Sequence, residues 1–178
     1  MLMKKNLIAA AFATTAILAA SNAFAAAGTV NFTGKIIDAA CTVDVGSQNQ
    51  TVDLGTYNKS EFSAAGDKSA ATAFNIVLKT CPETITSARI AFDGKPEATD
   101  SNLLAIDSSA TGAATGVAIN LMTADKAQLP LHGDNGYSYE LSSTAANTLK
   151  FFAQYQATAA AVTAGPANSV ANFSVIYN

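Results

Sequence analysis

Short runs of β-forming residues, each ended by turn residues, recur along this chain and constrain its fold more than any other feature. Between the runs lie glycines and Asx-Gly pairs such as Asp93-Gly94 and Asn135-Gly136, which are typical of hairpins and loops. Helical periodicity is hard to find, and strands of this number and length predict an antiparallel β-sandwich. The expected strands are Thr29–Ile37, Thr51–Leu54, Thr72–Lys79, Ile85–Phe92, Val117–Met122, Tyr137–Leu141, Thr148–Gln156 and Ala171–Tyr177, and Ser108–Gly116 is expected to be a flexible loop.

The composition narrows the classes of function. The chain has 178 residues, of which 49% are hydrophobic and 13% are charged. That length suits one domain with a core, and the apolar content excludes intrinsic disorder. The 10 basic residues are outnumbered by 13 acidic ones and form no basic block, which argues against binding to nucleic acid or to an anionic membrane surface. A surface with so few charges is suited to lying against other protein.

The first residues have the three parts of a secretory signal peptide. A positive start at Lys4-Lys5 precedes an uncharged run, Leu7–Ala20, and then Ala23-Phe24-Ala25 offers small residues to a signal peptidase. A transmembrane helix is the competing interpretation, but the run turns to small and polar residues and no stop-transfer charges follow. We therefore predict that residues 1–25 are cleaved, that the protein is exported, and that the mature chain does not insert in a membrane.

Export decides how the two cysteines are interpreted. Cys41 and Cys81 are the only cysteines, and an exported protein meets an oxidising compartment, so a structural disulfide is expected. The alternative is a metal site, but two thiols and one distant histidine are too few ligands. Closing a loop of about 40 residues would stabilise the fold by roughly 3–5 kcal/mol on the chain-entropy model.

Alternating residues mark both ends of the mature chain. At the N-terminal end apolar residues and glycine fall on one face and polar residues on the other, and at the C-terminal end large apolar residues recur at every second position, which predicts strands with one buried face. These faces carry Val30, Phe32, Gly34 and Ile36 at the N-terminal end, and Phe173, Val175 and Tyr177 at the C-terminal end. Strong strands at both ends need partners, which could lie inside the sandwich or on another chain.

No arrangement of residues indicates an active site. The only histidine, His132, lies in a Gly-rich turn, and no GxSxG elbow accompanies it, so a secreted hydrolase has little support. The segment Asp134–Glu140 only faintly resembles a calcium loop and lacks its ligand spacing. The acidic residues that could form a catalytic pair lie in turn-rich sequence: Asp93, Glu97, Asp100 and Asp107. We expect no enzyme activity, no metal site and no cofactor.

The residues described so far resemble the type 1 fimbrial (pilin) subunits of the bacterial chaperone–usher pathway over essentially the whole mature chain. The most specific part is Gly28–Cys41, GTVNFTGKIIDAAC, which is similar to the family's N-terminal extension running into its first disulfide cysteine. Val52–Gly55 and Phe74–Pro82, the approach to the second cysteine, also resemble family positions. The family carries a penultimate tyrosine and a glycine near the C-terminus, which here are Tyr177 and Gly165.

The resemblance implies an all-β fold, namely an incomplete immunoglobulin-like antiparallel β-sandwich that is completed by a donor strand from a neighbouring subunit. It implies that residues 26–36 form the donor-strand extension and that residues 37–178 form the pilin domain. With cleavage after Ala25 this extension is short. The resemblance assigns the donor strand to Val30, Phe32, Gly34 and Ile36, and the strand beside the groove to Gly165, Phe173, Val175 and Tyr177.

The resemblance also implies the function and the partners. The chain would be a structural subunit of a surface fimbria that polymerises head-to-tail by donor-strand exchange and supports cell adhesion, most like a major shaft subunit. Its partners would be identical or related subunits, a periplasmic chaperone and an outer-membrane usher. The alternative is a minor adaptor or a glycan-binding tip subunit, but the family's two-domain adhesins carry an extra lectin domain for which this chain has no room. A terminator should lack a usable donor strand, and this chain has one.

Overall fold

The computed structural model describes residues 28–178, so the predicted signal peptide, residues 1–25, lies outside the described residues. The chain divides into two parts, Met1–Ile36 and Ile37–Asn178. In the first part, residues 28–36 carry no regular secondary structure and are exposed, with Phe32 91% and Ile36 96% accessible to solvent. The predicted strand Thr29–Ile37 is therefore wrong for a single chain, because a strand exists only where a neighbour takes up its backbone hydrogen bonds.

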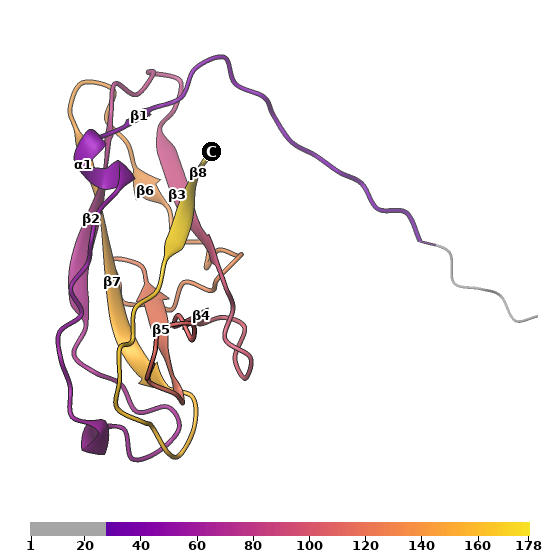
Figure 1. The fold of residues 1–178 in the computed structure, drawn as a ribbon. Coiled ribbons are helices and arrows are strands. Elements are labelled where there is room, and N and C mark those ends of the chain that lie inside the picture. Colours follow the sequence, from indigo (N-terminus) through magenta and orange to yellow (C-terminus); the bar gives the residue numbers. More distant parts are fainter. Residues whose placement is uncertain (1–27) are drawn as a thin grey trace, which may run out of the picture. The chain divides into compact units, whose positions relative to one another are not determined.

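The second part is a sandwich of two antiparallel sheets (Figure 1). The larger sheet has the strand order β1-β2-β7-β5-β4, and the smaller has the order β6-β3-β8. A one-turn helix, α1, and a 3₁₀ turn, η1, interrupt the chain between β1 and β2. The elements are β1 (Thr42–Val43), α1 (Val45–Gln48), η1 (Lys59–Glu61), β2 (Thr72–Lys79), β3 (Ser87–Gly94), β4 (Leu104–Ala105), β5 (Val117–Met122), β6 (Tyr139–Glu140), β7 (Asn147–Ala157) and β8 (Ala171–Tyr177).

The core lies between the two sheets and is filled by alternating residues of the long strands. Ile76 and Leu78 of β2 and Leu149 and Phe151 of β7 are almost completely buried, while Ile90 of β3 faces them from the smaller sheet. Apolar side chains of this size each stabilise the fold by about 1.5–3 kcal/mol when they leave water. The predicted antiparallel β-sandwich is confirmed.

Most of the predicted strands are found, and three have the predicted bounds, namely β2, β5 and β8. β3 lies two residues later than predicted. Ile85 belongs to the preceding turn, where its backbone nitrogen donates to Pro82 O at 3.0 Å. The pair Asp93-Gly94, predicted as a turn, continues β3, and a Cβ on Gly94 would lie 2.6 Å from Leu104 Cδ1. The glycine therefore serves a close packing contact and not a turn.

The predicted strand Thr51–Leu54 is not one of the strands in the described part of the chain. Val52 and Leu54 point inward as the alternation requires, but the segment lacks a backbone ladder. Near its start, the side chain of Gln50 donates to Asn75 O at 3.1 Å in place of a backbone bond. Among the described residues, this segment thus keeps the alternation of a strand without being paired along its backbone.

The segment Ser108–Gly116 is a loop, as predicted, but its end is anchored. Ala114 N donates to Pro166 O at 2.9 Å, and Thr115 forms an isolated bridge with Thr163. These bonds attach the loop to the stretch that leads into β8. No helix in residues 28–178 is long and apolar enough to cross a membrane.

Candidate functional site: an apolar groove beside the last strand

Strand β8 has an open edge. Among the described residues it pairs with β3 alone, in a register that runs from Ala88 opposite Tyr177 to Gly94 opposite Ala171. Its side chains alternate between the half-buried face, at Ala171, Phe173, Val175 and Tyr177, and the exposed face, at Asn172, Ser174 and Ile176. The predicted alternation at the C-terminal end is therefore present, and its apolar face points into the sandwich.

The hydrogen-bond pattern shows which backbone groups face the open edge. Asn178 N, just after β8, donates to Ser87 O of β3 at 3.2 Å, so these two residues form a hydrogen-bonded pair of the antiparallel ladder. In an antiparallel ladder only every second residue does so, which assigns the β3-facing bonds to the even-numbered residues of β8. The backbone N–H and C=O groups of Phe173 and Val175 consequently point away from β3, toward the position of a missing strand.

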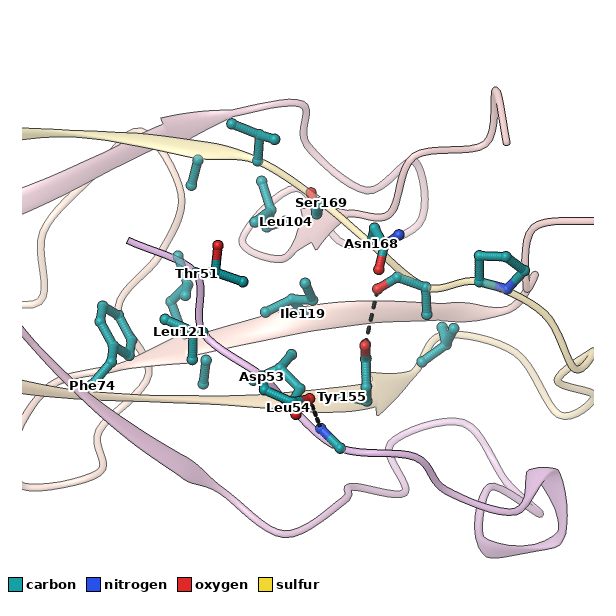
Figure 2. A pocket seen from close by; sticks show the side chains of 18 of the residues that line it. Thr51, Asp53, Leu54, Phe74, Leu104, Ile119, Leu121, Tyr155, Asn168 and Ser169 are labelled. Carbon is teal, nitrogen blue, oxygen red and sulfur yellow. Dashed lines mark hydrogen bonds between the residues drawn. The ribbon is translucent and has the colours of Figure 1, made fainter. Parts of the chain in front are cut away.

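A groove of about 1050 Å³ occupies that position (Figure 2). One wall is the segment Ser47–Tyr57, and the other is the stretch Val162–Phe173, which includes the start of β8. The floor is made by apolar side chains of the core: Phe74, Ile76, Phe92, Leu104, Val117, Ile119, Leu121 and Ala153. A long apolar trough beside an unpaired strand edge is suited to accepting an extended segment with apolar side chains on one face.

An aromatic cluster lies beneath the groove where β8 begins. Phe92 is the centre, with ring centroids 6.1 Å from Phe74, 5.5 Å from Phe151 and 6.4 Å from Phe173. These edge-to-face arrangements are the favourable ones for aromatic rings. Phe74, Phe92 and Phe173 all line the groove, so an entering side chain would meet aromatic surface there.

The wall Val162–Phe173 is attached to the larger sheet in the part that precedes β8. The hydroxyl of Tyr155, on β7, donates to Ala167 O at 3.0 Å, and Ser169 Oγ donates to Ala105 O at 2.6 Å. Burial raises the pKa of the Tyr155 hydroxyl, and the negative charge of Asp53 adds to this effect. A Cβ on Gly165 would lie 2.7 Å from Ala114 N, so only glycine lets the wall approach the 112–114 loop this closely.

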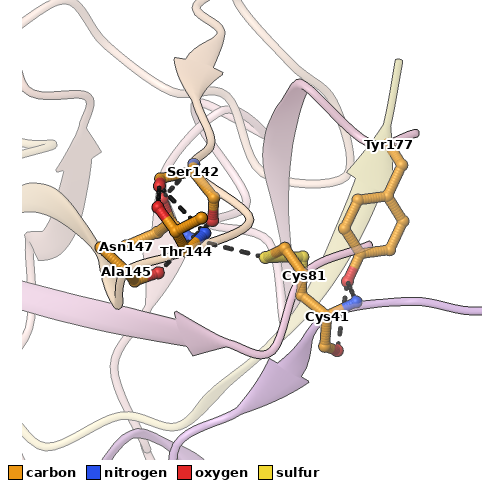
Figure 3. The surroundings of a disulfide bond; sticks show 7 residues. All are labelled: Cys41, Cys81, Ser142, Thr144, Ala145, Asn147 and Tyr177. Carbon is orange, nitrogen blue, oxygen red and sulfur yellow. Dashed lines mark hydrogen bonds between the residues drawn. A yellow bond between two sulfur atoms is a disulfide. The ribbon is translucent and has the colours of Figure 1, made fainter. Parts of the chain in front are cut away.

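The C-terminal end of β8 is held at the disulfide (Figure 3). Cys41 and Cys81 are bonded, as predicted, and both are buried. The hydroxyl of Tyr177 accepts a hydrogen bond from Cys41 N at 3.1 Å and lies 3.4 Å from Cys41 O. Burial raises the pKa of the Tyr177 hydroxyl.

The structure separates the predicted site residues into two groups. Phe173 and Gly165 line the groove, and Val175 and Tyr177 continue the same face of β8. Val30, Phe32, Gly34 and Ile36 lie on the exposed N-terminal arm, which we define as residues 28–36. The groove floor and the wall Ser47–Tyr57 were missed as site residues, although the inward alternation of Val52 and Leu54 was visible in the sequence.

His132 lies beside one of the predicted carboxylates. Its Nδ1 lies 3.0 Å from Asp93 Oδ1, and both side chains are exposed to solvent. Among the predicted carboxylates, Asp93 is taken up by this contact, while Asp100 and Asp107 accept hydrogen bonds from the backbone of their own turns. In residues 28–178, no three His, Cys, Asp or Glu side chains come together as a metal site would need.

The sequence matches the family described as Fimbrial protein over residues 30–178. The chain belongs to this family. It is 42% identical over 154 residues to the "Fimbrial subunit type 1" of Salmonella typhimurium, a match that covers 84% of this chain and 82% of that protein. It is 40% identical over 173 residues to the "Type-1 fimbrial protein, A chain" of Escherichia coli (strain K12), covering 96% and 94% of the two chains.

A solved structure agrees with the fold of this fimbrial protein. The P pilus rod subunit PapA is similar with a TM-score of 0.66 and 28% sequence identity, and the match covers 79% of this chain and all of that one. The predicted immunoglobulin-like pilin fold is confirmed by this similarity. The chain is a structural pilus subunit, and its relatives place it in a cell-surface fimbrium.

Proposed function

We propose that this fimbrial subunit polymerises head-to-tail, with the N-terminal arm of one copy filling the groove of the next. The observation that carries the proposal is the open edge of β8, which borders an apolar groove while the same chain has an exposed arm of alternating apolar residues. Val30 is 73% and Phe32 91% accessible to solvent, an exposure that large apolar side chains rarely keep without a partner.

The chemistry of the two surfaces is complementary. An added strand receives backbone hydrogen bonds from the free edge of β8, and its apolar side chains enter the groove. Burial of Val30, Phe32 and Ile36 would contribute roughly 1.5–3 kcal/mol each. A slip of one residue would turn all three toward solvent, so the alternation fixes the register.

The inward residues of β8 indicate one register for the arm. Antiparallel pairing, the common arrangement for strands in such sandwiches, with Phe32 opposite Phe173 seats the donor ring over the aromatic cluster. The same register sets Val30 opposite Val175 and Gly34 opposite Ala171. Gly34 and Ala171 are both small, which suits their position beside Gly94, where Leu104 and Val170 pack closely.

Each subunit then offers one donor arm and one acceptor groove. A contact between two different surfaces does not close on itself, so copies of the chain would form a filament. The mature subunit would begin after Ala25, following export through the periplasm. The donor extension would be residues 26–36, and the acceptor domain would be residues 37–178.

An unfilled groove is a hazard before assembly. Its apolar floor and the unpaired edge of β8 would favour aggregation. A periplasmic chaperone would occupy the groove and so prevent aggregation. At an outer-membrane usher, the arm of the next subunit would then replace the chaperone in the groove. Donor-strand complementation between pilins and their chaperones is an established example of this binding mode.

The test compares two neighbouring substitutions on the arm. Phe32→Asp places a charge on the face that enters the groove, whereas Thr33→Asp places the same charge on the opposite face. Unheated gel electrophoresis of surface-sheared fimbriae should show a ladder of polymers for the wild-type chain and for Thr33→Asp. The ladder should be absent for Phe32→Asp and for a chain that lacks residues 28–35. A normal ladder from Phe32→Asp would disprove the donor assignment, and monomers alone from the wild-type chain would favour a tip or adaptor role.

A further inference from the structure

The hydroxyl of Tyr177 joins the two sheets at one end of the groove. Tyr177 lies on β8 of the smaller sheet, and its hydroxyl contacts the backbone N and O of Cys41, just before β1 of the larger sheet. The disulfide in turn bonds Cys41 to Cys81, just after β2 (Figure 3). One side chain of the acceptor strand therefore holds a backbone position that is also covalently fixed to the other sheet.

Cys41 is also the residue at which the packed part of the domain begins. Residues 37–40, which follow the arm, are all exposed, and Cys41 is the first buried residue among residues 28–178, with 8% of its surface accessible. In a strand-exchanged filament, the arm would be held in one groove and the packed part of the domain would start at Cys41. The freedom of the joint between consecutive subunits would then reside in residues 37–40 and in how firmly Cys41 is held.

We infer that the Tyr177 hydroxyl is a positioning group for this joint, which fixes the direction in which each subunit's arm leaves its domain and so stiffens the filament. The inference rests on the proposed strand exchange. The β8 strand that accepts the arm of one neighbour also orients, through Cys41, the arm that is donated to the other neighbour. A bond to both polar groups of a single peptide residue restrains rotation there more than one bond would.

Tyr139 provides a matched control. Its hydroxyl also bridges the two sheets, from β6 of the smaller sheet to β7 of the larger one, by donating to Lys150 O at 2.7 Å, and its ring is likewise half-buried. Tyr139 is not among the residues that line the groove, and its bond does not involve Cys41. Tyr177→Phe and Tyr139→Phe each remove one hydroxyl from a tyrosine that bridges the sheets, but only the first removes a contact with Cys41.

The experiment uses full-length chains assembled into fimbriae. Hydrogen exchange of the intact fibres, measured by mass spectrometry over residues 37–43, should be faster in Tyr177→Phe than in the wild-type chain. Loss of a hydrogen bond with the usual net contribution to stability corresponds to an increase of about 2- to 12-fold in the exchange rate of the Cys41 amide. Electron micrographs should show a shorter persistence length for Tyr177→Phe fibres, and an unchanged persistence length for Tyr139→Phe fibres.

Three results would overturn the inference. Tyr177→Phe fibres as stiff as wild-type fibres would show that the hydroxyl does not control the joint. Equal softening in Tyr139→Phe would show a general loosening of the sandwich. Wild-type fibres together with no fibres from Tyr177→Phe would show that the hydroxyl is needed for assembly itself. Failure of the wild-type chain to form strand-exchanged polymers would instead reject the proposed function.

Discussion

The side-chain amide nitrogen of Asn147 lies 3.4 Å from the sulfur of Cys81 (Figure 3). The same amide donates to Ser142 O at 2.9 Å, and its oxygen accepts a hydrogen bond from Ser142 N at 2.7 Å. Asn147 thus fixes the turn between β6 and β7 and covers the disulfide at the same time. The disulfide is part of a packed and hydrogen-bonded end of the sandwich.

Removal of the disulfide should destabilise the domain. For the double variant Cys41→Ser, Cys81→Ser, the chain-entropy model predicts a loss of about 4 kcal/mol, because the bond closes a loop with a sequence separation of 40 residues. The free energy of unfolding would be measured by denaturant titration with a saturating peptide of residues 28–36. Wild-type protein in a reducing agent should match the double variant, and an unchanged midpoint in both would contradict a structural role.

Gly165 should not tolerate a side chain. In Gly165→Ala the new methyl group would press on the backbone of residues 112–114, where a Cβ would lie 2.7 Å from Ala114 N and 2.8 Å from Ala113 C. Overpacking of this kind costs about 1–3 kcal/mol, and it would displace the groove wall that leads into β8. We expect a lower thermal midpoint and weaker binding of the arm peptide.

Gly133→Ala is the control for Gly165→Ala. Its Cβ would meet Pro130 Cγ at 3.4 Å, which is an ordinary contact, and Gly133 is not among the residues that line the groove. Its thermal midpoint should be close to that of the wild-type chain. Equal decreases of the thermal midpoint in the two variants would show that the close approach at Gly165 is not the cause of the destabilisation.

The proposed register predicts an energetic coupling between Phe32 and Phe173. Phe32→Ala and Phe173→Ala should each weaken the polymer, but the double variant should lose less than the sum, by about 0.5–1.5 kcal/mol for one aromatic pair. Coupling would be measured as a double-mutant cycle on the affinity of the arm peptide for the groove. Val175→Ala, whose partner in this register is Val30, should be additive with Phe32→Ala.

The sequence predicted the arrangement of the longer strands because their patterns are local. In β2 and β8 the alternation agrees with the final packing, and β5 is a largely apolar run that is buried along its whole length, so the predicted bounds of these three strands are correct. The two-residue strands β1 and β4 carry too little pattern to be seen, and Gly94 gave a turn signal although its role is a close contact with Leu104. Such contacts depend on residues that are distant in the sequence.

The site was only partly predictable for the same reason. The inward residues of the arm and of β8 were visible as alternation at the two ends of the chain. The groove itself was not, because its floor combines residues from β2, β3, β4, β5 and β7 that only the fold brings together. The bond from Tyr177 to Cys41 spans 136 positions of the sequence, and no local pattern signals it.

The buried tyrosines predict a loss of stability at alkaline pH. Burial raises the pKa of the Tyr139, Tyr155 and Tyr177 hydroxyls above the usual value of about 10. The folded protein therefore keeps protons that the unfolded chain releases, so the tyrosine contribution is complete below pH about 10 and decreases as the pH rises further. Each tyrosine would lower the free energy of unfolding by at most about 1.4 kcal/mol per pH unit, and by less where water reaches the ring.

Tyr139→Phe isolates one of these groups. The Tyr139 hydroxyl donates to Lys150 O at 2.7 Å, and its ring packs 5.1 Å from that of Phe151, so the phenylalanine variant keeps the packing and loses the titrating proton. Denaturant titrations between pH 8 and 12 should show a shallower decline for this variant than for the wild-type chain. Parallel declines in the two proteins would mean that Tyr139 ionises equally easily in the folded and unfolded states, contrary to the effect of its burial.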